Sequence, residues 1–469
     1  MSPWKITSVF ASVIACLTAI SFLFPKDGVK VFDQTLFVPS VSDLTEANKT
    51  SYAIIDDAKP IEIPTEISEL GESIEYLQKA FDSKGYRFWL PSSNYFDDFW
   101  NTAENASSSN RVVRIMHYGD SQIEMDRITY QLRAYMQENF GGGGPGMIPF
   151  RTIIASSSVS QSASGSLTHL ASFGDSTVTR SRGNYGPMMQ CFRLAGGASV
   201  SVRASSNSKT DSRLKSFSNV RLVYNDRSGN FKATLSEKKS RYNSSQTSAN
   251  SGVGSMQWTL NPETSAFTLS ASGNADLYCV TVDNGPGVAV DNIPMRGCSG
   301  SQFTLVDKNL LTQSYAQLDV AMIILQFGGN SVPYLKSEKA ISNYCNTIGK
   351  QIDYIHQCCP KAKILFIGPS DMSTTEKGKL QTYPMLPTLI DSLRVTANNH
   401  NAAFWSIYHA MGGWNSMLAW KKEGRAGSDY IHFTPSGAVK MGETLSNAFN
   451  ENYRIFTLKR RWNASKNRK

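Results

Sequence analysis

The sequence predicts an α/β protein in which a three-layer α/β/α fold, built on a parallel sheet, carries an inserted all-β sandwich domain. In residues 111–154 and 284–456, apolar strands alternate with amphipathic helices, which is typical of a parallel sheet covered by helices on both faces. Residues 155–283 instead hold short segments with β-type alternation and no helical periodicity. The α/β domain is therefore predicted to be discontinuous, with the β domain between its two parts.

Length and composition agree with this division. A chain of 469 residues is too long for one ordinary domain, because compact domains usually hold roughly 100–200 residues. With 41% hydrophobic and 18% charged residues, the composition excludes both a membrane bundle and a disordered chain for most of the sequence. We therefore expect two or three folded units.

The N-terminus predicts a membrane segment. Residues 6–24 are uncharged and follow Lys5, and this length is about enough to cross a bilayer as a helix. An uncleaved signal anchor is favoured over a lipoprotein modified at Cys16, and a cleaved signal peptide stays open as an alternative. Lys26 and Lys30 follow the segment, so its flanking charges do not set its orientation.

The segments before the sheet are predicted in order along the chain. Residues 1–27 form the anchor, and residues 28–110 form a stalk that leads into an N-terminal lobe. Within this lobe, residues 69–81 have apolar side chains at helical spacing and predict a helix. An apolar strand follows at 112–116, and a helix-like pattern covers 126–140.

The remaining elements alternate as the fold class requires. The inserted domain has β-type segments at 220–224, 231–235, 256–260, 267–271 and 277–282. The second part of the α/β domain has strands at 320–325, 363–367 and 402–406, and helices at 337–356, 386–398 and 437–449. The run at 320–325 is continuously apolar, as expected for a strand that is buried on both faces of a parallel sheet.

Cysteines and charges exclude some classes of function. The seven cysteines have no metal-ligand spacing and predict neither a disulfide framework nor a zinc site, so no metal or cofactor is expected. The formal charge of +9 is concentrated in part in a basic tail, residues 457–469. Such a tail is usually a solvated end, although it would also suit an anionic surface. No nucleic-acid motif accompanies it, and no nucleic-acid partner is expected.

A candidate nucleophile follows the first strand. Ser121 ends the tripeptide Gly119-Asp120-Ser121, at the start of the predicted helix. Ligands collect at this edge of an open α/β sheet. A serine attacks only when an imidazole takes its proton and an acid orients that imidazole. Taken alone, however, the tripeptide is more typical of an ordinary turn.

The two partners of such a serine lie near the C-terminus. Asp429 and His432 are three residues apart, and this spacing can place both side chains on one face of a helical turn. The carboxylate would then reach one ring nitrogen while the other nitrogen points at a serine. This pair alone is weakly specific as well.

Two segments between these residues could stabilise an oxyanion, for which an acyl-transfer site needs preorganised donors. The turn that holds Gly297 and Gly300 offers backbone N–H groups, and Asn330 follows the buried strand directly. In isolation, a tight turn and a strand-ending turn are the more common explanations of these two segments.

Taken together, these motifs resemble the four sequence blocks of the SGNH (GDSL-like) hydrolases. Residue by residue, the resemblance implies Ser121 as nucleophile, Gly300 and Asn330 in the oxyanion hole, and Asp429 and His432 as acid and base. Gly297 competes with Gly300, which is preferred because family turns of this type place the second glycine there. The first block departs from the common pattern, since glutamine rather than leucine follows Ser121.

A closer resemblance is to bacterial peptidoglycan O-acetylesterases, in which His-Tyr-Gly-Asp-Ser opens the catalytic domain, as at residues 117–121 here. Those proteins carry a jelly-roll carbohydrate-binding module between the first and second blocks, at the position of residues 155–283. The resemblance implies a serine esterase that removes O-acetyl groups from a cell-envelope glycan. Its expected partners are that acetylated glycan and, through the N-terminal segment, the membrane, with the catalytic domain outside the cytoplasm.

Alternatives to this function stay open. The same triad serves lipases, thioesterases and acetyl transferases. A different class would be a non-catalytic glycan-binding surface protein on a decayed hydrolase scaffold, which the presence of every triad and oxyanion candidate argues against.

Overall fold

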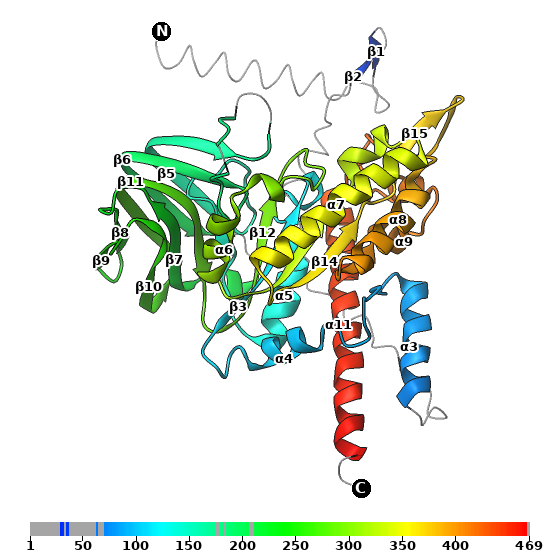
Figure 1. Cartoon of the computed structure of the whole chain (residues 1–469), viewed down its shortest axis with the longest axis horizontal. Helices are drawn as coiled ribbons and strands as arrows, with labels where there is room; N and C mark the ends of the chain where they lie inside the picture. The colour runs from blue at the N-terminus through cyan, green and yellow to red at the C-terminus, as the bar shows by residue number, and fades with distance from the viewer. Residues whose placement is uncertain are drawn as a thin grey trace, which may run out of the picture.

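The structure, a computed structural model, describes residues 29–31, 34–36, 62–63, 70–174, 178–181, 183–205 and 211–466 (Figure 1). The predicted membrane segment and most of the predicted stalk lie outside these residues. Among the helices of the described ranges, none combines the length and the apolar character that a membrane crossing requires.

A five-stranded parallel sheet forms the centre of the α/β domain. Its strand order is β12-β3-β13-β14-β17, and every neighbouring pair is parallel. The strands are β3 (Val112–Gly119), β12 (Gly287–Pro294), β13 (Val320–Gln326), β14 (Lys363–Gly368) and β17 (Ala403–Ser406). Nearly all of their residues are buried, as expected of strands that are covered on both faces.

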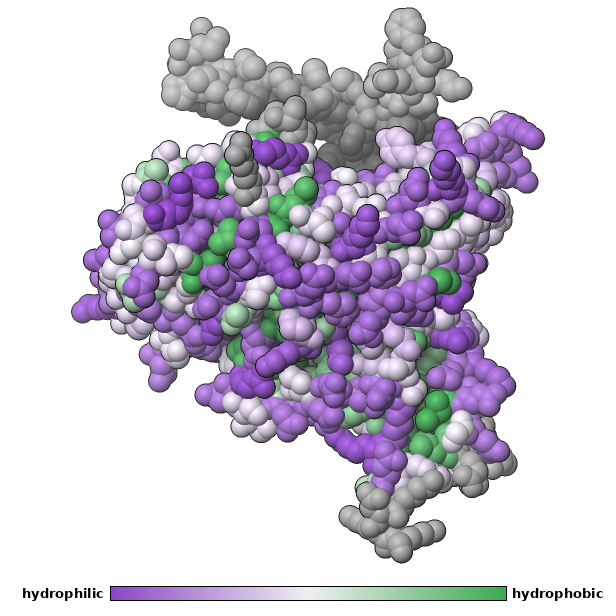
Figure 2. Space-filling view, viewed as in Figure 1, coloured by the Kyte–Doolittle hydropathy of each residue, from purple (hydrophilic) through white to green (hydrophobic). Residues whose placement is uncertain are grey.

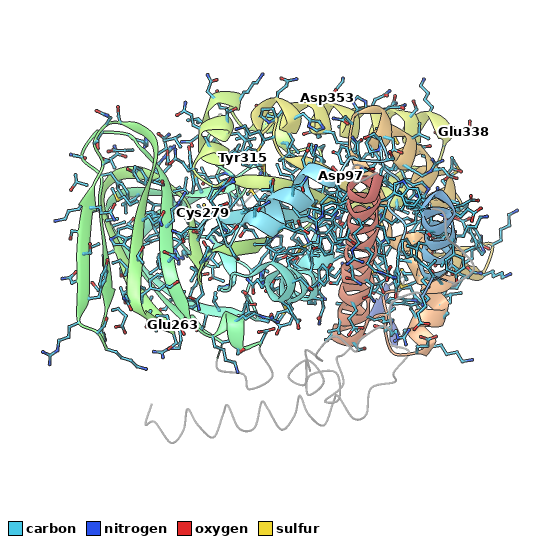
Figure 3. The ribbon with its side chains drawn as sticks, turned by 90° about the horizontal axis from the view of Figure 1, so that it is seen from below. Asp97, Glu263, Cys279, Tyr315, Glu338 and Asp353 are labelled. Atoms are coloured by element: carbon cyan, nitrogen blue, oxygen red, sulfur yellow. The ribbon has the colours of Figure 1, made fainter. Side chains whose placement is uncertain are left out.

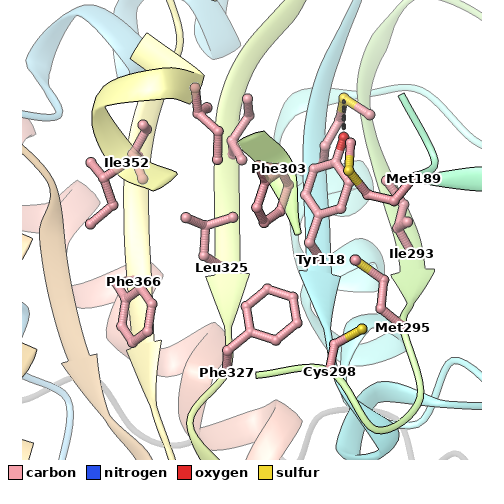
Figure 4. Close-up of a cluster of buried hydrophobic side chains, with 14 of the residues drawn as sticks. Tyr118, Met189, Ile293, Met295, Cys298, Phe303, Leu325, Phe327, Ile352 and Phe366 are labelled. Carbon is pink, nitrogen blue, oxygen red and sulfur yellow. Dashed lines mark hydrogen bonds between the residues drawn. The ribbon is translucent and has the colours of Figure 1, made fainter. Parts of the chain in front are cut away.

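Helices cover both faces of this sheet. One face packs against α6 (Lys308–Ala316), α7 (Glu338–Cys358) and α8 (Leu386–Asn399). Leu325 and Phe366 of the strands meet Ile352 of α7 there (Figure 4). The other face packs against α4 (Asp97–Asn105), α5 (Thr129–Phe140), α9 (Ile407–Met411), α10 (Ser416–Lys422) and α11 (Pro435–Lys466).

The shorter elements lie around this domain. Helix α3 (Leu70–Lys84) packs Leu77 and Phe81 against Ile455 of α11. Figure 2 shows a mostly hydrophilic face on which hydrophobic residues form small patches, one of them between these two helices. Two hairpins are β1 (Val29–Val31) with β2 (Gln34–Leu36) and β15 (Ser373–Glu376) with β16 (Lys379–Thr382).

The inserted domain is a separate antiparallel sheet of eight strands. They are β4 (Gly146–Ile148), β5 (Val159–Ala171), β6 (Gln190–Ala204), β7 (Phe217–Asp226), β8 (Lys232–Glu237), β9 (Tyr242–Thr247), β10 (Gly252–Thr264) and β11 (Ala266–Asp283). The first half of β11 pairs with β6 and β8, and its second half pairs with β4 and β7. The strands enclose their own apolar core, which includes Trp258. The predicted α/β fold with an inserted β domain is therefore confirmed.

Buried charges lie where the two domains meet. Arg114 of β3 forms ion pairs with Asp283 at the end of β11 and with Asp291 of β12, and all three side chains are almost completely buried. Cys279 of β11 is buried in the same region, on the side of the antiparallel sheet that faces the helices (Figure 3). On the face of the parallel sheet that packs against α5, Arg133 of this helix pairs with Asp126.

The last helix is longer than the sequence predicted. The prediction ended it near residue 449 and gave residues 457–469 as a basic tail. In the structure α11 continues to Lys466. Lys459 Nζ lies 3.7 Å from the Asp97 carboxylate of α4, and Arg460 donates to Glu104 of the same helix at 3.0 Å. These tertiary partners compensate the charges that made the segment look like a solvated tail.

Candidate active site

Ser121 lies at the carboxyl edge of the parallel sheet, directly after β3. It begins a 3₁₀ helix, Ser121–Ile123, which Asp120 caps by accepting the Gln122 N–H at 3.0 Å. A side chain at Gly119 would lie 3.0 Å from Ile123 and 3.2 Å from the Gln326 carbonyl, so the turn requires a small residue there. The predicted helix begins at Thr129 rather than at residue 126, because Met125 and Asp126 have positive φ.

The structure brings Ser121, His432 and Asp429 together although 311 positions separate the serine from the histidine. Ser121 Oγ lies 2.7 Å from His432 Nε2, and His432 Nδ1 lies 2.7 Å from Asp429 Oδ2. These are hydrogen-bond distances in the arrangement that a nucleophile, a base and an orienting acid require.

Asp429 and His432 lie in a loop, so the predicted helical turn is wrong. Tyr430 between them has a φ of 54°, which a right-handed helix excludes. Asp429 Oδ1 instead accepts the N–H groups of Ile431 and His432, each at 3.1 Å. One carboxylate oxygen thus fixes the conformation of the loop, while the other, Oδ2, bonds to the imidazole.

This pairing shifts the pKa values of both groups. The hydrogen bond from His432 to Asp429 raises the pKa of the imidazole. Burial alone would raise the pKa of Asp429, but its bonds to His432 and to the two backbone N–H groups lower it below the ordinary value. The carboxylate therefore stays ionised while the imidazole gains and loses a proton.

Ser121 and His432 line a cavity of about 210 Å³. Tyr334 lies on its rim with 79% of its surface exposed. The other lining residues are Asp120, Gln122, Gln326, Phe327, Gly329, Asn330, Pro333, Pro369, Ser370, Met372, Ile407 and Ile431. The walls are mainly apolar, and the polar groups converge near the serine.

Asn330 lines this cavity and is oriented by two acceptors. Its Nδ2 donates to Asp120 Oδ2 at 3.2 Å and to the Cys298 carbonyl at 3.0 Å. Burial raises the pKa of Asp120 to about 6. Asn330 is thus tied both to the nucleophile turn and to the loop after β12, and an oxyanion at Ser121 would compete with these acceptors for its N–H groups.

Gly300 lies behind the cavity wall and not among the residues that line it. It has a φ of 88°, and a Cβ atom there would lie 2.9 Å from the Cβ of Phe327, a residue that lines the cavity. Gly297 also has positive φ, but no atom lies within 4 Å of a Cβ built on it. The role of Gly300 as an oxyanion donor stays a prediction.

Two residues to which the sequence analysis gave no role in the site bind its segments together. Gln122 and Arg127 both follow Ser121 closely and both reach the loop that carries His432. Arg127 donates to the carbonyls of Ser121 at 2.7 Å, Glu124 at 3.0 Å and Phe433 at 3.4 Å. The sequence signal for Gln122 was its departure from the family's leucine, and Arg127 had no signal.

His117 is a core histidine and not a second base beside His432. It is completely buried, with Nε2 at 3.1 Å from Gln326 Oε1 and Nδ1 at 3.0 Å from Thr129 Oγ1. Burial lowers its pKa to about 4. In the described part of the chain, no cluster of histidine, cysteine and carboxylate side chains has a metal-binding arrangement.

No family model and no curated protein matches the sequence. A solved peptidoglycan O-acetylesterase matches the structure with a TM-score of 0.63 and 20% identity, over 77% of this chain and 97% of that one. Family two carbohydrate esterases from Clostridium thermocellum (9% identity, 56% of this chain and 95% of that one) and Cellvibrio japonicus (10% identity, 64% and 99%) match with TM-scores of 0.27 and 0.25, too low to add to the comparison. The chain therefore has the SGNH-type α/β/α fold with an added antiparallel β domain, a fold that it shares with the peptidoglycan O-acetylesterase.

Proposed function

We propose that the protein is a serine esterase that removes O-acetyl groups from a cell-envelope glycan, with peptidoglycan as the expected polymer. The observation that carries this proposal is the pair of 2.7 Å contacts that link Ser121 to His432 and His432 to Asp429. The fold shared with a peptidoglycan O-acetylesterase supports the choice of an acetylated glycan.

The mechanism follows from the positions of these groups. Ser121 Oγ attacks the acetyl carbonyl carbon while its proton passes to His432 Nε2. The tetrahedral oxyanion accepts hydrogen bonds from Asn330 and, as predicted, from a backbone N–H at Gly300. The imidazolium then returns the proton to the departing sugar oxygen, which leaves an acetyl ester on Ser121. Water activated by His432 releases acetate and restores the serine.

The size of the cavity favours a short acyl group. Pockets for drug-sized ligands have volumes of roughly 300–1,000 Å³, whereas this cavity has about 210 Å³. An acetyl group fits within such a space, while a long lipid chain would extend beyond it. This difference ranks an acetylesterase above a lipase.

We also propose that the N-terminal segment anchors the protein in a membrane, with the catalytic domain in the periplasm or outside the cell. Residues 6–24 supply the apolar length. Tethering would raise the local concentration of the enzyme at an immobile polymer.

The first test measures acetate release by the full-length chain from O-acetylated peptidoglycan and from acetylated xylan. We expect release from peptidoglycan, and its loss in Ser121→Ala, because Ser121 is the hydroxyl that lies at hydrogen-bond distance from His432. Circular dichroism should confirm that the variant is folded.

Other outcomes would point to the alternatives. Transfer of acetyl to an added sugar without free acetate would indicate a transferase, and release only from thioesters or longer esters would indicate another acyl hydrolase. Glycan binding with no turnover of any ester would contradict the enzyme proposal and favour the binding protein.

A further inference from the structure

Gln122, which replaces the leucine common after the nucleophile, makes hydrogen bonds on both sides of the catalytic histidine. Its Nε2 donates to the Ile431 carbonyl at 2.8 Å, and its Oε1 accepts the Phe433 N–H at 3.4 Å. Nε2 also lies 3.4 Å from Ser370 Oγ in the loop after β14. One side chain therefore holds the backbone immediately before and immediately after His432.

The loop needs such a support. From Gly427 to His432 it contains turns and bends but neither helix nor strand, and it rejoins regular pairing only through a bridge between Ala426 and Phe433. The bonds that Asp429 makes within it fix its shape but not its distance from Ser121. Contacts from outside the loop set that distance. The Ser373 N–H bonds to the Tyr430 carbonyl at 3.1 Å, and Arg127 donates to the Phe433 carbonyl at 3.4 Å, but only Gln122 bonds to the backbone on both sides of His432 among the contacts of the described residues.

The position of Gln122 allows it to set the distance between the histidine loop and Ser121. The residue is adjacent to Ser121, only 8% of its surface is exposed, and its own N–H is bonded to Asp120 at 3.0 Å. Nucleophile and support thus belong to the same rigid 3₁₀ turn. A movement of the histidine loop away from Ser121 would break both bonds to Gln122.

We infer that Gln122 is a positioning residue that holds His432 at hydrogen-bond distance from Ser121 by bracketing the histidine backbone. This inference rests on the proposed function, since it assigns Gln122 to the same reaction. A leucine at this position has no donor or acceptor to offer, so chains that carry one must hold their histidine loop by other contacts.

The test compares Gln122→Met with Gln137→Met in the full-length chain. Methionine keeps the length of glutamine and removes both hydrogen-bonding groups. Gln137 is a matched control, because it is also buried, bonds to a backbone carbonyl, that of Gly144, at 2.8 Å, and lies on α5 outside the cavity lining. Because a displacement of 1 Å can cost about 100-fold in rate, we expect Gln122→Met to lower kcat for p-nitrophenyl acetate by about tenfold or more, with KM unchanged. Gln137→Met should keep the kcat of the parent.

A titration of the His432 ring by NMR gives a readout that does not depend on any substrate. Asp429, Arg127 and Asp120 are charged neighbours of this ring. Asp429 lies in the same loop and keeps its bond to the ring when the loop moves. A loop that moves away from Ser121 loses burial and the nearby charge of Arg127, both of which lower the ring pKa, so this pKa should rise above that of the parent in Gln122→Met. If the parent proves inactive toward every ester, the function proposal fails while this titration still decides the role of Gln122.

Two results would overturn the inference. One is a parent-like kcat and ring pKa in Gln122→Met. The other is a rise in KM with kcat unchanged, which would make Gln122 a substrate contact. Should Gln122→Met not fold, Gln122→Glu keeps the acceptor for Phe433 but places an oxygen against the Ile431 carbonyl, and it must lower kcat in the same direction.

Discussion

At the residue scale, the proposed reaction depends on the pairing of His432 with Asp429. The hydrogen bond raises the pKa of the imidazole, so the proton that His432 takes from the serine is held more strongly than by an isolated histidine. The carboxylate keeps its charge because its other oxygen is bonded to two backbone N–H groups. The acid therefore orients the base and stabilises its charged form.

The pH dependence of the reaction should reflect this shift. His432 must be neutral to accept a proton, so kcat/KM should rise with pH through the pKa of the ring. Because that pKa is raised, the pH at which kcat/KM reaches half of its maximum should lie above about 6.5. Initial rates of acetate release between pH 5 and 9 check this expectation. The variant Asp429→Asn should lower the pH of half-maximal kcat/KM, and it should lower the rate by on the order of 10⁴-fold.

Asn330 offers a second test at this scale. Asn330→Ala should lower kcat by about 10²–10³-fold, the usual loss of one oxyanion donor, with little change in KM. Steady-state kinetics with p-nitrophenyl acetate measure both constants. A variant with parent-like kcat would remove Asn330 from the oxyanion hole.

The sequence predicted the triad residues but not all of their surroundings. Ser121, Asp429 and His432 could be chosen because their motifs have a fixed order and spacing along the chain. The contacts of Gln122 could not be found in this way, because its partners Ile431 and Phe433 lie 309 and 311 positions away. The predicted helical turn at Asp429 failed because local spacing does not reveal the positive φ of Tyr430.

At the element scale, the strands predicted after residue 319 and the helices predicted at 337–356 and 386–398 lie within a few residues of the observed ones. In the β domain, the segments predicted at 267–271 and 277–282 are parts of one long strand, β11. The strand predicted at 363–367 is Lys363–Gly368, and the helix predicted at 337–356 is Glu338–Cys358, with Ser337 as its cap. The error at the end of α11 has a different cause. Its charges are balanced by Asp97 and Glu104, which belong to another helix, and periodicity within one segment carries no information on such partners.

The turn between Gly297 and Gly300 can be tested as an element. An L-residue in the left-handed region costs about 1–2 kcal/mol, so Gly297→Ala should lose roughly that much stability and keep its activity. Gly300→Ala should lose more, because its Cβ would also press on Phe327, and its kcat should fall. Urea unfolding and acetate release compare the two variants, and the reverse ranking would favour Gly297 in the oxyanion hole.

At the scale of the whole molecule, a buried carboxylate connects the α/β domain with the β domain. Asp126 pairs with Arg133 of α5 and also accepts the Ser158 hydroxyl at 2.5 Å. Ser158 stands directly before β5. The loop after the nucleophile, the helix behind it and the first long strand of the β domain therefore share one carboxylate.

Breaking this pair should destabilise both domains together. Arg133→Met leaves Asp126 charged and buried, a change that typically costs about 3–5 kcal/mol. Guanidinium unfolding followed by far-UV circular dichroism and by tryptophan fluorescence should give one shifted transition. Two separate transitions would show that the domains unfold independently, and Arg133→Met combined with Asp126→Leu should recover part of the loss.

The two connections to the β domain lie against each other. The Val288 N–H bonds to the Gly141 carbonyl at 3.0 Å, the Asn284 N–H bonds to the Gly143 carbonyl at 2.9 Å, and a side chain at Gly287 would overlap Gly141. Because the two ends of the β domain lie side by side, another domain with adjacent ends could replace it without distorting the α/β domain. Any replacement must still supply the carboxylate that Asp283 offers to Arg114. The β domain could therefore be exchanged while the residues around Ser121 stay in place.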